Sequence, residues 1–264
     1  MRMKRIIVTN DDGIESIGLL SLARALATFA EVWVVAPERD QSGASHALTT
    51  GTPLRWRRAD VVGVPHAYGV GGTPADCVYF GLSHLLAPGG ADLVVSGINR
   101  GYNLADDITY SGTVAAALEG ALLGVPGIAI SLEAFSETDL SSAARFACAL
   151  VESVLGKPEL LPAGSFLNVN IPCDAKSDEY KVTVAGRRVY SLEVQLGTDP
   201  KGRPYFWIGG DPKQHEDIRG SDCSAVLDER MISVTPLHID LTSISGVGLW
   251  RGGGTAISGF RRRD

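Results

Sequence analysis

Cysteine is scarce in this sequence of 264 residues, and long apolar runs are absent. The four cysteines stand far apart, at Cys77, Cys148, Cys173 and Cys223. Since none belongs to a C-x-x-C pair, the spacing indicates neither a zinc knuckle nor a small disulfide framework. We therefore expect free thiols in a reducing compartment, and hence a cytoplasmic protein.

No uncharged apolar stretch reaches the ~18 residues that a membrane-spanning helix needs. The apolar run after the basic N-terminus covers only residues 6–8, which is too short for the core of a signal peptide. Basic residues are not in excess either, because the net charge is -6 and the one dense cationic run is Arg261–Arg263. The sequence therefore predicts a protein that binds neither a membrane nor a nucleic-acid polymer.

Several common catalytic motifs are also missing. The sequence has no P-loop of the form G-x-x-x-x-G-K-[ST], and its glycine-rich residues 68–74 do not match the dinucleotide fingerprint. It lacks the G-x-S-x-G elbow as well. These absences count against an ATPase, a nicotinamide-dependent enzyme and an α/β-hydrolase.

The first two thirds of the chain alternate between short apolar runs and helical periodicity. Strands are predicted at 5–9, 31–36, 92–96, 127–132 and 166–171, and helices at 17–29, 77–86, 113–123 and 141–155. This alternation predicts an α/β fold with an open, mostly parallel sheet and helices on both faces. The length is compatible with one domain over residues 1–264.

The pattern changes after about residue 180, where residues typical of β-strands predominate. Further strands are predicted at 182–184, 189–195, 205–208 and 231–237, with a turn at 198–202. The domain divides into a core at about 1–180, a projecting β-hairpin arm at about 186–228, a closing strand at about 229–242 and a C-terminal extension at 243–264. The arm's aromatics are compatible either with packing on the same chain or with a dimer contact.

The candidate site residues follow the ends of predicted strands, where an open parallel sheet binds its ligands. The first strand leads directly into Asp11 and Asp12, and Gly13 permits a sharp turn. Such a tripeptide is typical of ordinary turns, so its position is what favours a site. Ser42 and Asn99 follow two further strands. With the aspartates they form an all-oxygen set that suits one hard divalent ion such as Mg²⁺, Mn²⁺ or Ca²⁺.

Ser111, Gly112 and Thr113 open an alanine-rich helix. Free backbone N–H groups and the helix dipole favour an anion there, although Ser and Thr are also ordinary N-caps. We expect these residues, with Asn99 and Asn103, to bind the phosphate group of a substrate. A cation site facing an anion site predicts a phosphoric monoester hydrolase, in which the metal polarises a phosphoryl oxygen and lowers the pKa of a bound water.

Five short motifs follow one another along the chain, at 8–14 (VTNDDGI), 36–43 (APERDQSG), 72–78 (GTPADCV), 96–101 (SGINRG) and 110–117 (YSGTVAAA). Together with residues 233–237 and 240–242 they resemble the SurE (survival protein E) family of nucleotidases. The resemblance covers most of the chain. Five motifs in one order are far more specific than any of them alone.

This resemblance implies a Rossmann-like three-layer core with one divalent metal ion, Mg²⁺ or Mn²⁺, per subunit. The implied metal ligands are Asp11, Asp12, Ser42 and Asn99. It further implies hydrolysis of nucleoside 5′- and 3′-monophosphates, extended in some members to polyphosphate, and a homodimer or homotetramer joined by C-terminal elements. Tyr102 departs from the family pattern, and we expect it to shape the rim of the pocket.

The catalytic roles and two rival functions stay open at the level of the sequence. Asp11 and Asp12 are the catalytic candidates, but water could attack directly, or Asp11 could act as general base or as nucleophile. His46 and His238 are weaker candidates for proton transfer. One rival is a phosphatase with an aspartyl-phosphate intermediate, which usually needs Asp-x-Asp after its first strand. The other is a nucleotide sensor, which has no need of open metal coordination positions.

Overall fold

The computed structural model describes residues 2–134, 137–175, 179–191, 193–209, 214–245 and 247. Its centre is one nine-stranded sheet. The strands of this sheet are β1 (Arg5–Thr9), β2 (Glu31–Pro37), β3 (Trp56–Arg58), β4 (His66–Val70), β5 (Leu93–Arg100), β6 (Gly127–Leu132), β7 (Ser165–Ile171), β8 (Tyr180–Val182) and β13 (Ile232–His238). Their order across the sheet is β3-β4-β2-β1-β5-β6-β7-β13-β8. The strands predicted for the first two thirds of the chain are all present.

The strands between β4 and β7 all run parallel, so the predicted open, mostly parallel sheet is confirmed. From β1 the chain fills one side of the sheet with β2 and β4, and then the other side with β5, β6 and β7. This order defines a doubly wound, Rossmann-like fold in which the strand order reverses beside β1. At the edges, β3 is antiparallel to β4, and β13 is antiparallel to β7.

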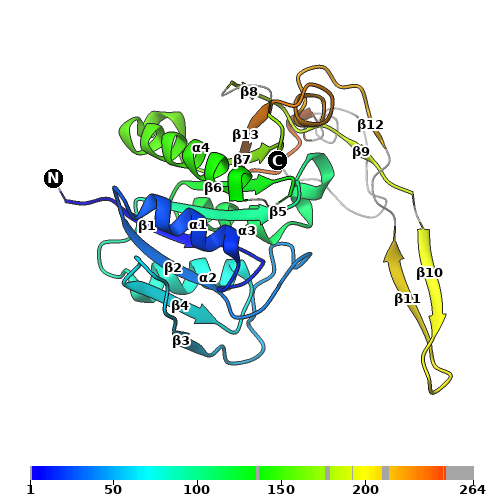
Figure 1. Ribbon diagram of the computed structural model, residues 1–264, viewed down its shortest axis with the longest axis horizontal. Helices are drawn as coiled ribbons and strands as arrows, with labels where there is room; N and C mark the ends of the chain where they lie inside the picture. The colour runs from blue at the N-terminus through cyan, green and yellow to red at the C-terminus, as the bar shows by residue number, and fades with distance from the viewer. Residues whose placement is uncertain are drawn as a thin grey trace, which may run out of the picture.

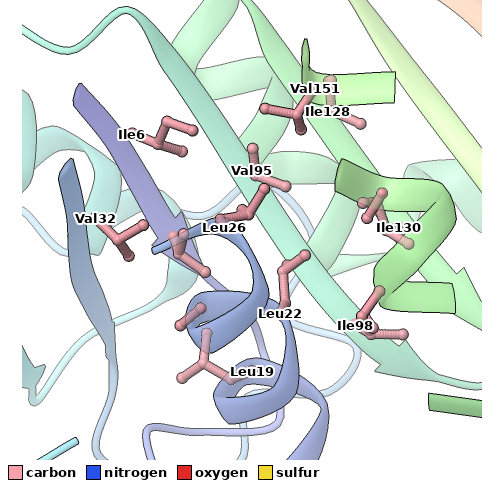
Figure 2. Close-up of a cluster of buried hydrophobic side chains, with 14 of the residues drawn as sticks. Ile6, Leu19, Leu22, Leu26, Val32, Val95, Ile98, Ile128, Ile130 and Val151 are labelled. Carbon is pink, nitrogen blue, oxygen red and sulfur yellow. The ribbon is translucent and has the colours of Figure 1, made fainter. Parts of the chain in front are cut away.

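Helices cover both faces of the sheet and give the fold three layers (Figure 1). They are α1 (Ile17–Leu26), α2 (Pro74–Phe80), α3 (Gly112–Leu122) and α4 (Glu137–Gly156), with the short turns η1 (Gly81–Leu85), η2 (Ala105–Thr109), η3 (Pro158–Leu160) and η4 (Ser224–Asp228). α1 packs beside α4 on one face, and α2 packs beside α3 on the other. Side chains of successive strand residues point to opposite faces of the sheet. Ile6 therefore packs in the core beneath α1, and Ile7 packs in the core beneath α2. Figure 2 shows Leu22 and Leu26 of α1 within the larger of these cores, close to Val95 of β5.

A β-hairpin arm projects from the body of the molecule (Figure 1). Its strands β10 (Glu193–Thr198) and β11 (Pro204–Gly209) form an antiparallel pair. A second short ladder, between β9 (Arg188–Val189) and β12 (Gln214–His215), lies next to the arm in the chain.

The tip of the arm is a tight turn organised by Asp199. Its carboxylate accepts hydrogen bonds from the backbone amides of Lys201 at 2.8 Å and Arg203 at 2.9 Å. The turn predicted at 198–202 is therefore confirmed. Residues 248–264, which hold most of the predicted C-terminal extension and the cationic run, lie outside the described residues.

β3 and β4 have no counterpart among the predicted strands. β3 is exposed throughout and forms by pairing with β4, so its own sequence carries no burial pattern. In β4, Gly69 interrupts the apolar run that marks a buried strand. The helix predicted at 77–86 begins earlier, at Pro74, and its second half is the π-helical turn η1. Within the described part of the chain, no helix combines the length and the apolar character needed to cross a membrane.

Candidate active site

The loop after β1 places two carboxylates next to each other at the carboxyl edge of the sheet. Asn10 and Asp11 are buried, and Asp12 is partly buried. The loop turns at Gly13, whose φ of 98° lies in the left-handed region that glycine adopts without strain. The Asn10 side-chain amide donates a hydrogen bond to the Gly13 carbonyl at 3.0 Å and so stabilises the turn. The acidic pair therefore lies where the strand order reverses.

Asp11 lies against the N-terminus of α3. The Thr113 hydroxyl donates a hydrogen bond to the Asp11 carboxylate, and the Thr113 backbone amide is a further partner. Burial still raises the pKa of Asp11 above its usual 3.8, because the loss of solvation outweighs these bonds. Gly112 is needed beside it, since a Cβ there would lie 2.9 Å from the Asp11 Cβ. Ser111 is the N-cap and accepts a hydrogen bond from the Val114 amide at 3.1 Å.

Asp12 has an incomplete set of partners. Burial and the neighbouring charge of Asp11 raise the pKa of Asp12 from 3.8 to about 6, although the Arg100 backbone amide donates to it and acts in the opposite direction. Among the described residues, Asp12 Oδ2 and Asn10 Oδ1 are buried side-chain atoms without a hydrogen-bond partner. Since buried polar atoms are normally paired, these oxygens fit a bound cation.

Ser42 is oriented by Asp40, a residue that is not among the site residues predicted from the sequence. One Asp40 carboxylate oxygen accepts hydrogen bonds from the Ser42 amide at 2.7 Å and from the Ser42 hydroxyl at 2.6 Å. The hydroxyl thus directs its proton to Asp40 and keeps its lone pairs for a cation. The Gln41 amide donates to the Asp11 carbonyl at 2.8 Å and joins this loop to the acidic loop. The Asp-x-Ser spacing, typical of a local side-chain-to-backbone turn, is the signal that could have identified Asp40.

Asn99 and Asn103 belong to the end of β5 and the segment that follows it. The Asn99 side-chain nitrogen donates to the Gly101 carbonyl at 2.9 Å, so the side-chain oxygen is the atom available to a cation. The Asn103 side-chain nitrogen donates to the Ser131 hydroxyl, and the Asn103 backbone amide donates to Asn170 Oδ1, both at 2.8 Å. One of the two side-chain amide hydrogens of Asn103 is left for a ligand.

A cavity of about 980 Å³ joins these groups. The predicted site residues on its wall are Asp11, Ser42, Asn99, Asn103 and Ser111. The others adjoin Asp11. Asp12 lies between Asp11 and the Arg100 amide, and Gly112 and Thr113 contact Asp11.

The oxygen donors around Asp11 match the preferences of a hard divalent cation. Carboxylate, hydroxyl and amide carbonyl oxygens are the ligands that Mg²⁺ and Mn²⁺ favour. Asp40 adds negative charge, since it interacts electrostatically with both Asp11 and Asp12. Within the part of the chain that the structure describes, no group of three or more His, Cys, Asp or Glu side chains could hold a metal ion. The donor set of Asp11, Asp12, Ser42 and Asn99 thus depends on hydroxyl and amide oxygens for its completion.

Three other residues singled out in the sequence do not form part of the cavity wall. His238 pairs with Ser165 at the amino end of β7, whereas the site lies at the carboxyl ends of the parallel strands, so a role in proton transfer is wrong for His238. His46 Nε2 lies 2.7 Å from Glu119 Oε2. The Tyr102 hydroxyl lies 3.4 Å from the Arg230 guanidinium.

The strand order places the molecule in the doubly wound α/β class, whose members bind ligands in the crevice where the order reverses. Here that crevice gathers oxygen donors beside the N-terminus of a helix. Comparison with protein families narrows the class, because the family model described as "Survival protein SurE" matches residues 6–192. The chain belongs to the SurE family.

Individual relatives are similar in sequence to this chain over nearly its whole length. A protein of Myxococcus xanthus named "5'-nucleotidase SurE" is 50% identical over 264 residues, which cover 99% of this chain and 97% of the relative. A protein of the same name from Geobacter sulfurreducens is 46% identical and covers 92% of this chain and 91% of its own. The crystal structure of the SurE protein from Aquifex aeolicus is similar with a TM-score of 0.77 at 39% identity, and the match covers 94% of this chain and 99% of that one.

Proposed function

We propose that this chain is a divalent-metal-dependent 5′-nucleotidase, which hydrolyses nucleoside monophosphates to nucleoside and phosphate. The observation that carries the proposal is the cavity in which Asp11, flanked by Asp12, lies against the N-terminus of α3. The relatives named 5′-nucleotidase support the same reaction. We extend the proposal to 3′-monophosphates, and to other phosphomonoesters and polyphosphate as secondary substrates.

The proposed cofactor is one Mg²⁺ or Mn²⁺ ion per subunit, held by Asp11, Asp12, Ser42 and Asn99. When bound, such an ion polarises a phosphoryl oxygen and lowers the pKa of a coordinated water. Two observations support this assignment. Asp12 Oδ2 is buried without a partner, and the pKa values of both aspartates are raised, so that a cation would stabilise their ionised forms.

The phosphate group is assigned to the start of α3 and to Asn103. The backbone N–H of Gly112 lies in the first turn of α3, where amides have no partner inside the helix, and the helix dipole favours negative charge there. Of the two aspartates, Asp11 is the one on the cavity wall. Its raised pKa suits a group that accepts the proton of the attacking water, and Thr113 holds its carboxylate in one orientation.

The test is phosphate release from a panel of nucleoside monophosphates, measured with Mg²⁺, with Mn²⁺ and with EDTA. We expect wild-type release to require the metal, and Asp12→Asn to lower kcat/KM at least about 100-fold. The exposed Asp60 supplies the matched control Asp60→Asn, which should behave as wild type. Near-normal, EDTA-insensitive turnover by Asp12→Asn would refute the proposal. Hydroxylamine trapping of an acyl phosphate would favour the aspartyl-phosphate rival instead.

We also propose that the protein is a cytoplasmic homodimer or homotetramer. The arm supports self-association, because Leu196 and Phe206, which share one face of it, are exposed apolar side chains. The four cysteines support a reducing compartment, because all of them are free thiols.

A further inference from the structure

The cavity extends well beyond the phosphate-binding residues. Next to Ser111 its wall continues over Tyr110 and onto four residues at the base of the arm, here called the arm root: Tyr190, Ser191, Val194 and Ile208. A phosphate group fills only a small part of about 980 Å³, and cavities of this size hold whole small-molecule ligands. The far end therefore has room for the remainder of the substrate.

The far end offers apolar surface suited to a flat ring. Val194 and Ile208 are cross-strand partners in the β10–β11 ladder, so their side chains share one face of the arm. Most of the Ile208 side chain, 87%, is exposed in the part of the chain that the structure describes. Tyr110, in the segment just before α3, adds an aromatic ring that is 67% exposed. Aromatic and apolar side chains of this kind stack against nucleobases without needing a particular base.

The arm root also carries an unsatisfied polar atom. Ser191 lies on the cavity wall, and its Oγ is buried without a hydrogen-bond partner among the described residues. Since buried hydroxyls are normally bonded, this atom fits a polar group of a ligand. Asp107 and Glu193 line the same region, and the Asp107 carboxylate is paired with the Arg188 guanidinium.

The turn η2 fixes the arm root relative to the phosphate end of the cavity. Asp107 accepts hydrogen bonds from the Arg188 guanidinium and from the Tyr190 hydroxyl. The Asp107 carbonyl also accepts hydrogen bonds from the Tyr110 amide at 3.0 Å and from the Ser111 amide at 3.1 Å. A single residue thus connects the arm root to the N-cap of α3, so the two ends of the cavity keep a defined separation.

We propose that the arm root and Tyr110 form the subsite for the nucleoside half of the substrate. The base lies against Tyr110, Val194 and Ile208, and a polar atom of the nucleoside bonds to Ser191. This inference rests on the proposed nucleotidase function and deepens it, because it makes contact with the base the property that distinguishes nucleotides from other phosphomonoesters.

The test compares kcat/KM for AMP with kcat/KM for ribose 5-phosphate, which carries the same sugar and phosphate but no base. We expect Tyr110→Ala and Ile208→Ala each to lower the value for AMP about 10-fold and the value for ribose 5-phosphate less than about twofold. Trp207→Ala is the matched control, since Trp207 adjoins Ile208 on the opposite face of β11 and is also largely exposed. In this control, the ratio of kcat/KM for AMP to kcat/KM for ribose 5-phosphate should equal that of wild type.

The subsite would be overturned if the ratio of kcat/KM for AMP to kcat/KM for ribose 5-phosphate were unchanged in the Tyr110 and Ile208 variants. This includes the case in which kcat/KM falls equally for both substrates. If wild-type protein released phosphate from neither compound, the proposed function would fail separately. Calorimetric binding of AMP would then decide the subsite by itself. Weaker binding by Ile208→Ala than by Trp207→Ala would support it, and equal binding by the two variants would overturn it.

Discussion

Asp12 combines partial burial with a close like charge, and both effects oppose its ionisation. Its pKa is about 6 in the folded protein, against a usual value of 3.8. A carboxyl group with a higher pKa when folded binds its proton more tightly in that state. Its contribution to stability is therefore complete below about pH 3.8 and is lost as the pH rises through about 6. At neutral pH the metal-free protein carries a charge that disfavours folding.

Asp12→Asn should accordingly stabilise the metal-free protein at about pH 7.5, by about 1 kcal/mol, a figure kept low because Asp12 is only partly buried. In urea unfolding with EDTA, we expect the variant to have the higher midpoint at that pH and a similar midpoint near pH 4. Added Mn²⁺ should raise the midpoint of wild type much more than that of the variant. A variant that is less stable than wild type in EDTA at about pH 7.5 would contradict this account.

Gly112→Ala tests the contact between α3 and the acidic loop. The added Cβ would lie 2.9 Å from the Asp11 Cβ and 3.1 Å from the Pro74 Cγ, so Asp11 must move. We expect kcat/KM for AMP to fall at least about 10-fold while the protein stays folded by circular dichroism. Gly156→Ala is the control, because a Cβ there meets nothing within 4 Å. Equal activity of the two variants would show that Asp11 tolerates displacement.

The position of the candidate site is predictable because its residues lie at or soon after the carboxyl ends of strands, and these ends converge at one edge of a parallel sheet. The hydrogen bond from Thr113 to Asp11 could not be predicted from the sequence, because it depends on the direction of a side chain at the start of a helix. The sequence pattern also wrongly suggests that His238 lies near the site, for a different reason. A strand pattern does not reveal strand direction, and the antiparallel β13 places His238 at the opposite edge of the sheet.

At the scale of elements, the segment between β2 and β3 that carries Ser42 is fixed to two helices. His46 Nε2 lies 2.7 Å from Glu119 Oε2 of α3, and the Thr49 hydroxyl donates to Asp76 of α2 at 2.7 Å. Glu119 and Asp76 are both buried. The position of Ser42 therefore depends on contacts made several residues later in the same segment.

His46→Ala should leave the buried Glu119 carboxylate without this partner and lower the free energy of unfolding by about 2 kcal/mol. It should also raise the Mn²⁺ concentration needed for half-maximal activity several-fold, because the Ser42 segment loses an anchor. Adding Glu119→Gln to this variant should recover part of the stability, since a neutral amide is cheaper to bury. Urea unfolding and Mn²⁺ titration measure the two effects. An unchanged Mn²⁺ requirement would separate His46 from the site.

The predictability of each element followed from its burial. β1, β2, β5, β6 and β7 are mostly buried and read as continuous apolar runs, as strands of a covered parallel sheet do. β3 is exposed and is defined by its neighbour rather than by its own residues, so the sequence pattern could not show it.

At the scale of the whole molecule, the apolar face of the arm predicts self-association. Leu196 is 82% exposed and shares its face of the arm with Phe206, its cross-strand partner. We expect wild-type protein to be a dimer or tetramer by light scattering after gel filtration, and Leu196→Asp to shift it toward the monomer. Gln195→Asp, one residue earlier on the other face, should leave the mass unchanged. A monomeric wild type, or equal masses for the two variants, would contradict this role.

The reversal of strand order beside β1 has a mechanical consequence. Asp11, Asp12 and Ser42 follow strands of one half of the sheet, whereas Asn99 belongs to β5, which begins the other half. An ion shared by these residues would cross-link the two halves at the β1–β5 junction. If such an ion is bound, chelation should accelerate amide hydrogen exchange at that junction and leave exchange between β6 and β7 unaltered, because the ion would hold the two halves of the sheet together.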